Sequence, residues 1–303
     1  MIYRNYLGLD IQTQAMRAVA LRRTGKTTNL SGGRLLGLEE GVVVPSFRHP
    51  NIRDIDRFIG NLQEILDPLA SGEERISLAL PEQCGILLLE DVESVLKSKS
   101  EGIEVLKWQL REKLPEGVEL QLDYQVIDRD ENGRQKVLVA GMSVDVLQQY
   151  EEVLNQAGYG AELIGFRSMA LYNYYHPRVD MGENFALIHA EDESVSFYYY
   201  QNGALAFHRS RNVGNEIENL YREISRSLAG EAERLSGLNR AAVYLHTNRE
   251  DQDELLQILV PLFANEPQLL KPSIEKLTVE PLTLTDRQSV SLVTAIGAAE
   301  RLM

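Results

Sequence analysis

Two segments of the sequence place carboxylates at the end of a buried strand, where such groups can do chemistry. In "YLGLDIQTQAMRAVAL" an apolar strand ends at Asp10, a polar turn containing Thr13 follows, and a second strand begins. A carboxylate at such a corner can hold Mg²⁺ through water, or it can cap the corner as an Asx-turn. In "FALIHAEDESVSF" a similar opening ends in Glu191, Asp192 and Glu193. The chain therefore contains two similar openings with different chemistry.

Other candidate sites do not match the patterns that their chemistry requires. "TGKTT" at 24–28 is not a phosphate-binding P-loop, because that motif needs a glycine where Ala20 stands. The five histidines are scattered without an i, i+4 pair, so we expect no metal site. Cys84 has no sequence context of a nucleophile, and we expect it to be a buried strand residue. The sequence thus predicts no catalytic residues.

Composition and charge narrow the class of protein. The 303 residues, 44% hydrophobic and 25% charged, are typical of a globular protein with room for two domains. A net charge of −14 argues against binding to nucleic acid or, by charge alone, to anionic lipid. The single cysteine excludes an intrachain disulfide and fits a reducing, cytoplasmic setting. No signal peptide and no apolar run near the roughly 18 residues of a membrane span is present, so we expect no direct membrane insertion.

The elements that position these residues form two similar halves. In the first half, strands are expected at 7–11, 15–21, 34–44, 75–80, 84–92, 120–128, 135–143 and 161–166, and helices at 51–69, 101–114, 144–157 and 167–175. In the second half, strands are expected at 185–190, 194–201, 203–211 and 241–247 and weakly near Leu269, and helices at 214–235, 251–263 and 288–302. Because the second half begins as the first does, we predict a duplicated α/β domain. The first lobe would span 1–180, with an inserted subdomain at about 82–143, and the second, shortened lobe 181–303.

Several of these stretches resemble a known family. "LGLDIQTQAMRAV" resembles the first phosphate loop of the actin and sugar-kinase superfamily. "SLALPEQCGILLLEDV", "VLKWQLREKLPEGVELQLDYQVI" and "VLVAGMSVDVLQQYEEVLNQAGYGAELIGF" resemble, in this order, the PilM family of type IV pilus assembly proteins, of which MshI is a shorter relative. The resemblance covers about residues 5–215 and returns in "SLVTAIGAAERLM".

The resemblance implies a fold, a location and a partner. The fold would be α/β and actin-like (RNase H-like), with two lobes and a small inserted subdomain in the first. The protein would be a cytoplasmic assembly component of a type IV pilus or related secretion machine, recruited to the inner face of the inner membrane and to the pilus assembly platform. Its partner would be the cytoplasmic N-terminal tail of a single-pass inner-membrane protein, PilN in pilus systems. The tail would lie extended in a groove between the first lobe and the inserted subdomain.

The sequence also departs from the nucleotide-binding pattern of that family. Asp10 and Thr13 match its first phosphate loop, but Gln12 replaces a glycine. In the second loop the family's Asp and Gly fall on His189 and Glu191, and the later loop "HTNRED" has no glycine. Acidic groups beside a triphosphate cost on the order of several kcal/mol, and without glycine the backbone cannot approach a ligand closely. We therefore predict a degenerate ATP/Mg²⁺ site, no bound cofactor and no enzyme activity.

Three functions from different classes stay open at this point. The favoured one is a non-catalytic scaffold that holds a peptide tail. The second is a nucleotide-dependent switch of pilus biogenesis that still binds ATP through Asp10 and Thr13. The third, a sugar or small-molecule kinase, is disfavoured because no second-lobe aspartate stands where a catalytic base is expected. The absence of glycine in "HTNRED" favours the scaffold over the switch.

Trp108 is a candidate for partner binding. The helix expected at 101–114 has an apolar stripe formed by Ile103, Leu106, Leu110 and Leu114. Trp108 lies about 140° from Ile103 around the helix, outside that stripe. It therefore either packs on a neighbouring strand or belongs to a partner surface, where aromatic anchors are enriched. We predict that Trp108, with Arg111 nearby, borders the groove for the tail.

Overall fold

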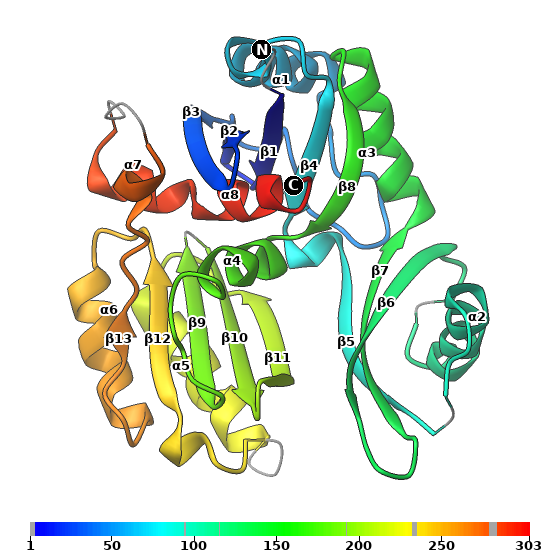
Figure 1. The fold of residues 1–303 in the computed structure, drawn as a ribbon, viewed down its shortest axis with the longest axis vertical. Helices are drawn as coiled ribbons and strands as arrows, with labels where there is room; N and C mark the ends of the chain where they lie inside the picture. The colour runs from blue at the N-terminus through cyan, green and yellow to red at the C-terminus, as the bar shows by residue number, and fades with distance from the viewer. Residues whose placement is uncertain (1–3, 94, 115, 192, 232–234, 279–283) are drawn as a thin grey trace.

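The computed structural model describes residues 4–93, 95–114, 116–191, 193–231, 235–278 and 284–303. Each of its two lobes is built on a five-stranded sheet, and a three-stranded sheet lies beside the second lobe (Figure 1). Among the described residues, no helix is both long and apolar enough to cross a membrane.

The first lobe contains a sheet in the order β3-β2-β1-β4-β8. Its strands are β1 (Asn5–Ile11), β2 (Ala15–Thr24), β3 (Thr27–Gly37), β4 (Arg75–Leu80) and β8 (Gly160–Phe166). β1 pairs antiparallel with β2 and parallel with β4. This arrangement is an antiparallel meander followed by parallel strands.

The second lobe repeats this topology in the order β11-β10-β9-β12-β13. Its strands are β9 (Phe185–Glu191), β10 (Ser194–Gln201), β11 (Ala204–Asn212), β12 (Ala242–Thr247) and β13 (Gln268–Leu269). β9 pairs antiparallel with β10 and parallel with β12, as β1 does with β2 and β4. The predicted equivalence of 7–21 and 185–201 in two matching sheets is therefore confirmed at the level of topology.

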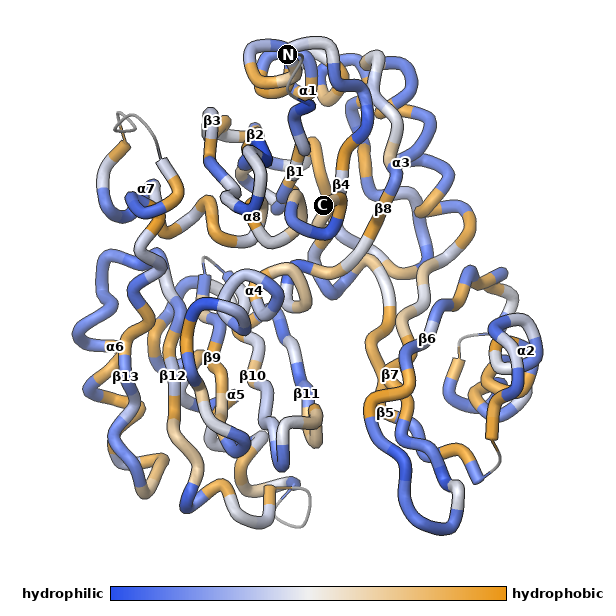
Figure 2. The backbone as a smooth tube through the Cα atoms, viewed as in Figure 1, coloured by the Kyte–Doolittle hydropathy of each residue, from blue (hydrophilic) through white to orange (hydrophobic). Residues whose placement is uncertain are grey.

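The third sheet, in the order β5-β7-β6, is small and largely apolar. It comprises β5 (Gly85–Val92), β6 (Leu120–Arg129) and β7 (Gln135–Ser143). Figure 2 shows hydrophobic residues concentrated on β5 and β7. Helix α2 (Lys99–Leu110) covers the side of this sheet that is turned away from the second lobe (Figure 1) and buries Leu106 and Leu110 against it.

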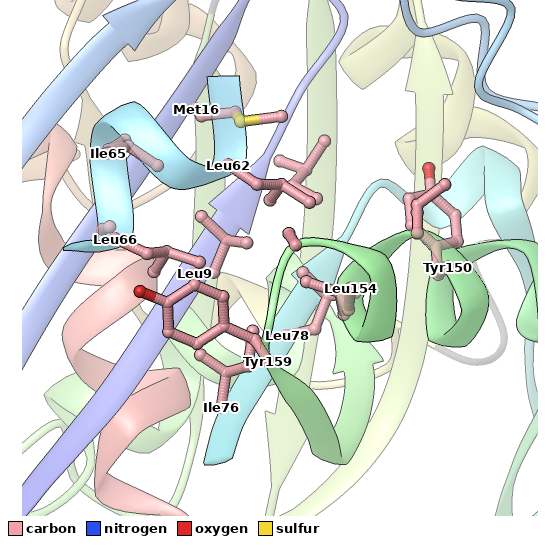
Figure 3. Close-up of a cluster of buried hydrophobic side chains, with 14 of the residues drawn as sticks. Leu9, Met16, Leu62, Ile65, Leu66, Ile76, Leu78, Tyr150, Leu154 and Tyr159 are labelled. Carbon is pink, nitrogen blue, oxygen red and sulfur yellow. The ribbon is translucent and has the colours of Figure 1, made fainter. Parts of the chain in front are cut away.

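Within the described ranges, seven further helices lie around the two larger sheets. They are α1 (Ile55–Ala70), α3 (Val144–Gln156), α4 (Arg167–Tyr175), α5 (Ile217–Gly230), α6 (Gln252–Leu259), α7 (Asp286–Ser291) and α8 (Val293–Glu300). α1 and α3 pack on one face of the first sheet, where Leu9 and Leu78 meet Leu62 and Leu154 (Figure 3). α5 and α6 cover one face of the second sheet. α4 and α8 lie between the lobes and share a single hydrophobic cluster with both sheets.

Helix α8 crosses the first sheet at backbone distance. A Cβ atom on Gly8 of β1 would lie 2.0 Å from the carbonyl oxygen of Ala295 in α8. A Cβ atom on Gly297 of α8 would lie 1.9 Å from the carbonyl oxygen of Ala170 in α4. Both positions therefore require glycine. The division at 180/181 stays a prediction, and α8, which follows all the second-lobe strands in sequence, packs on the first sheet.

The structure corrects several predicted elements. A strand was expected at 34–44, but β3 occupies Thr27–Gly37 and follows β2 through a tight turn at Gly25, with φ of 63°. The prediction was wrong because an exposed edge strand rich in Thr, Ser and Gly has no strong hydrophobic alternation. Cys84 is buried, but it ends a 3₁₀ turn (Glu82–Cys84) instead of lying in a strand. The helix expected at 288–302 is divided into α7 and α8 at Leu292.

Candidate functional site

The carboxylate at the end of β1 is completely buried and paired with two arginines. Asp10 has 0% exposure. Its Oδ1 accepts a hydrogen bond from Arg167 Nε at 2.6 Å, and its Oδ2 accepts one from Arg17 Nη1 at 3.2 Å and one from Arg167 Nη2 at 3.3 Å. Arg17 lies on the neighbouring strand β2, where it is the cross-strand partner of Asp10. Both oxygens of this carboxylate are therefore engaged by guanidinium groups.

The corresponding end of β9 carries a second buried carboxylate, Glu191, which reaches the same arginines. Its Oε2 accepts hydrogen bonds from Arg167 Nη2, from Gln12 Nε2 at 3.0 Å and from Arg17 Nη1 at 3.4 Å. Arg167 is the first residue of α4, directly after β8, and only 3% of it is exposed. We call Asp10, Gln12, Arg17, Arg167 and Glu191 the interlobe cluster. It joins the two strand–turn–strand openings through Arg167.

Two histidines contact the other oxygen of Glu191. His246 Nε2 lies 3.0 Å from Glu191 Oε1, and His189 Nε2 lies 3.4 Å from the same atom. The register explains this convergence, because His189 on β9 is paired with His246 on β12 and Glu191 follows His189 by two residues on the same face. On its other side, His246 Nδ1 is 2.8 Å from the hydroxyl of Tyr175 in α4.

The environment fixes the charge of most of these groups. Burial alone would raise the pKa of Glu191, but the guanidiniums of Arg167 and Arg17, with a contribution from the nearby His189, outweigh burial and hold that pKa well below its usual range. Burial would lower the pKa of Arg167, but Asp10 and Glu191 raise it, so the guanidinium stays charged. Burial lowers the pKa of His246, which Glu191 offsets only in part. The interlobe cluster therefore contains two carboxylates balanced by two guanidiniums.

The predicted site residues fall in two separate places. Asp10 belongs to the interlobe cluster, and Thr13 is half-buried in the following turn, where it helps to line a cavity of about 80 Å³ together with Arg167 and Glu191. Asp192 lies outside the described residues. Trp108 is 66% exposed on α2 of the third sheet, so it does not pack on a neighbouring strand. The guanidinium carbon of Arg111 lies 4.9 Å from the centre of its ring.

Sequence reasoning missed most of the interlobe cluster. Arg167 meets Asp10 across 157 positions of sequence, a separation that no local pattern reports. A usable signal was present for His189 and Glu191, because two polar residues at i and i+2 in an otherwise apolar strand must share one face. An i, i+4 pair of histidines is a helical spacing, whereas His189 and His246 lie on strands.

Two lobes with matching sheets, each with a buried carboxylate at the end of its first strand, define a protein of the actin-like ATPase fold. This chain belongs to the type IV pilus assembly protein PilM family, whose model matches residues 8–235. The expected family and the expected two-lobe fold are thereby confirmed. Among curated proteins, none matches this sequence.

Solved structures show the same fold at low sequence identity. A chain of the "PilM-PilN type IV pilus biogenesis complex" is 17% identical, with a TM-score of 0.77 over 97% of both chains. A Bacteroides thetaiotaomicron protein with an actin-like ATPase fold and unknown function is 11% identical, with a TM-score of 0.57 over 89% of this chain and 92% of that one. The ethanolamine utilization protein EutJ from Carboxydothermus hydrogenoformans is 11% identical, with a TM-score of 0.51 over 99% and 90% of the two chains.

Proposed function

We propose that this chain is a non-catalytic assembly component of a type IV pilus or a related secretion machine. In this role it holds the cytoplasmic N-terminal tail of a single-pass inner-membrane protein similar to PilN. The observation that carries the proposal is membership of the PilM family, supported by a shared fold over 97% of both chains with a protein solved as a PilM–PilN complex. The chain would act in the cytoplasm, recruited to the inner face of the inner membrane by that tail.

The interlobe cluster supports a role that needs no nucleotide. Asp10 is the residue that would hold hydrated Mg²⁺, but both of its oxygens accept hydrogen bonds from Arg17 and Arg167. A Mg²⁺ ion would have to displace these guanidiniums from a buried carboxylate, which leaves unpaired charge in a low-dielectric site. The carboxylate of Glu191 would also repel a phosphate placed beside Thr13. Asp10 and Thr13 are then the remains of a phosphate loop in a degenerate site.

An ATP-binding switch is the competing function, and calorimetry separates the two. Titration of the protein with Mg-ATP is expected to give no heat beyond that of dilution, because Arg17 and Arg167 already pair with the carboxylates of both openings. A dissociation constant for Mg-ATP in the micromolar range would contradict the proposal that the scaffold works without a nucleotide. It would restore the switch that works through Asp10 and Thr13.

We infer that the tail contacts Trp108 of α2 and Arg111, which directly follows this helix. A large aromatic side chain that is 66% exposed, with a guanidinium stacked on its ring, has the chemistry of an interface anchor. Its helix is already fixed by the buried Leu106 and Leu110, so Trp108 is free to contact a partner. Arg111 can then meet a carboxylate or a carbonyl oxygen of the tail.

The fluorescence of Trp108 tests this placement directly, because it is the one tryptophan of the sequence. Peptides that correspond to N-terminal cytoplasmic tails of inner-membrane pilus proteins are added to the protein. Binding is expected to shift the emission of Trp108 to shorter wavelength as water leaves the ring. Calorimetry on Trp108→Ala should show binding weakened by roughly 1–3 kcal/mol, with a smaller loss for Arg111→Ala.

The matched control is Tyr221→Ala, which removes another exposed aromatic ring, 38% exposed on α5 of the second lobe. It should leave tail binding unchanged. If the peptide binds without changing the emission of Trp108, the anchor is elsewhere. The next candidate is then the groove of about 340 Å³ between β5 and β11, lined by Ile86, Leu88 and Phe207. If no tail binds at all, the scaffold function is wrong.

A further inference from the structure

Three buried side chains of the second lobe converge on one point. His189 and Glu191 lie two residues apart on β9, so both side chains project from the same face of the sheet. His246 on the parallel strand β12 is paired in register with His189. Each residue is almost completely buried, and their ligand-type atoms all lie within 4.8 Å of one another. Two adjacent rigid strands therefore fix the relative positions of two imidazoles and a carboxylate.

The separations between Glu191 and each histidine match those of a metal-binding site. In a tetrahedral site with bonds of about 2.0–2.1 Å, neighbouring ligand atoms lie roughly 3.3 Å apart. Glu191 Oε1 is 3.0 Å from His246 Nε2 and 3.4 Å from His189 Nε2. We propose that His189, Glu191 and His246 form a binding site for one transition-metal dication, with Zn²⁺ the best match. This inference goes beyond the scaffold function and does not depend on it.

An unsatisfied nitrogen is the second observation that points to a ligand. His189 is 4% exposed, and its Nε2 has no hydrogen-bond partner although it points toward Glu191. Buried polar atoms almost always have a partner, and one without a partner costs stability. A metal ion between Nε2 of His189 and Oε1 of Glu191 would satisfy this atom.

The second ring nitrogen of His246 has a hydrogen-bond partner, as is usual for histidines that bind metal. Its Nε2 faces the proposed ion, while its Nδ1 is 2.8 Å from the hydroxyl of Tyr175. A hydrogen bond at the second ring nitrogen fixes the tautomer and the orientation of a histidine that binds metal. We assign Tyr175 as the residue that positions His246.

The remaining contacts of Glu191 decide which ion suits the site. Its second oxygen, Oε2, is held by Arg167, Arg17 and Gln12, so one oxygen is left for a metal. Mg²⁺ and Ca²⁺ prefer several oxygen ligands and fit poorly, whereas imidazole suits Zn²⁺ and the later transition metals. Three protein ligands leave the fourth position of a tetrahedral site for a water molecule.

Direct metal binding tests the proposal. The full chain is treated with EDTA, the chelator is removed, and ZnCl₂ is titrated in by calorimetry. We expect one equivalent of Zn²⁺ to bind with a micromolar or tighter dissociation constant and to raise the melting temperature. Tyr175→Phe should weaken binding by about 10–100-fold, the loss typical of a residue that orients a ligand, and His189→Ala should weaken it by at least that factor.

His49→Ala is the control, because His49 is an exposed histidine of the first lobe and its loss should not change Zn²⁺ binding. The proposal is overturned if the unaltered protein binds no Zn²⁺, or if His189→Ala binds Zn²⁺ as the unaltered protein does. Should the histidine variants not fold, Co²⁺ bound to the unaltered protein decides. An intense visible absorption band of four-coordinate Co²⁺ supports the site, and the weak spectrum of hydrated Co²⁺ overturns it.

Discussion

The two strand–turn–strand openings share a backbone plan but differ in what surrounds their carboxylates. Asp10 at the end of β1 is contacted by guanidinium groups on both oxygens. Glu191 at the end of β9 has guanidiniums on one oxygen and imidazoles on the other. The same end of the first strand in each lobe thus carries a buried carboxylate, but the groups around the two carboxylates differ. The fold alone therefore does not establish the function of such a site.

The comparison also shows where the positive charge comes from. Arg17 and Arg167 both belong to the first half of the chain, together with Asp10, whereas the second half supplies Glu191. If the lobes separated, the first would keep two guanidiniums and one carboxylate, and the second would keep Glu191 with its two histidine neighbours but without a guanidinium. Attraction between these groups in a buried setting therefore opposes opening of the lobes.

Among the changes that test this comparison, removal of the Arg167 side chain should lower the free energy of unfolding most. In Arg167→Ala, Asp10 and Glu191 lose one of the two guanidiniums that they share, and we expect the free energy of unfolding to fall by about 3–5 kcal/mol. Urea unfolding measures this change. The control is Arg75→Ala, which removes an exposed ion pair with Glu73 and should cost no more than about 1 kcal/mol. A loss below about 1 kcal/mol for Arg167→Ala would mean that water reaches both carboxylates.

The second largest effect is expected for a methyl group on Gly8, which tests a difference between the first and the second sheet. β1 has glycine where α8 crosses it, whereas the face of β9 turned to the first lobe carries a large side chain, Leu187. Gly8→Ala would push against the backbone of Ala295, and we expect a loss of about 3 kcal/mol in unfolding free energy. Gly60→Ala is the matched control, because Gly60 is exposed within α1 with open space around it. It should stabilise the protein by about 0.5–1 kcal/mol, and equal effects of both changes would refute the close crossing.

The edge strands β3 and β11 should differ in their response to pH. Burial lowers the pKa of His208 on β11 from 6.5 to about 4, with Glu82 and Arg211 acting in opposite directions, and β3 contains no histidine. The folded state then binds fewer protons than the unfolded state between these values. The contribution of His208 to stability is fully present above pH 6.5. It should be lost toward pH 4, by up to about 1.4 kcal/mol per pH unit.

The measurement is urea unfolding across this pH range for the unaltered protein and for His208→Gln. The variant cannot take up this proton, so its curve should be flatter by the same amount. His176→Gln, at an exposed histidine, is the control and should follow the unaltered protein. Parallel curves for the unaltered protein and His208→Gln would show that folding does not change the pKa of His208.

The smallest expected effect concerns Thr13, three residues after Asp10. Within the described part of the chain, no hydrogen bond of its hydroxyl is recorded, and the side chain is half-buried beside a small cavity. Thr13→Ala should change the unfolding free energy by less than about 0.5 kcal/mol. Thermal unfolding of both variants measures this: Asp10→Ala should lose much stability, and Thr13→Ala almost none. A loss above about 1 kcal/mol for Thr13→Ala would reveal a structural role that the contacts do not explain.

Local patterns predicted the frame of the molecule better than its charged centre. Alternating apolar residues located β1, β2, β9 and β10, and the stripe on α2 correctly separated the buried Leu106 and Leu110 from the exposed Trp108. Local patterns failed for Arg167, because its partners come from β1 and from β9 and depend on how the lobes meet. They also failed for His246, whose neighbours are set by the parallel pairing of β12 with β9.

The crossing of α8 over β1 also determines when the first lobe can finish folding during synthesis of the chain. The strands β1 to β4 leave the ribosome early, but the helix that packs beside Val19 and Leu21 comes from residues 293–300. At about 5–20 residues per second, translation needs on the order of 10–40 s to supply that helix. During this interval the apolar face of the first sheet is a surface that a chaperone can hold. Completion of the first lobe is thus a late event in the biogenesis of this protein.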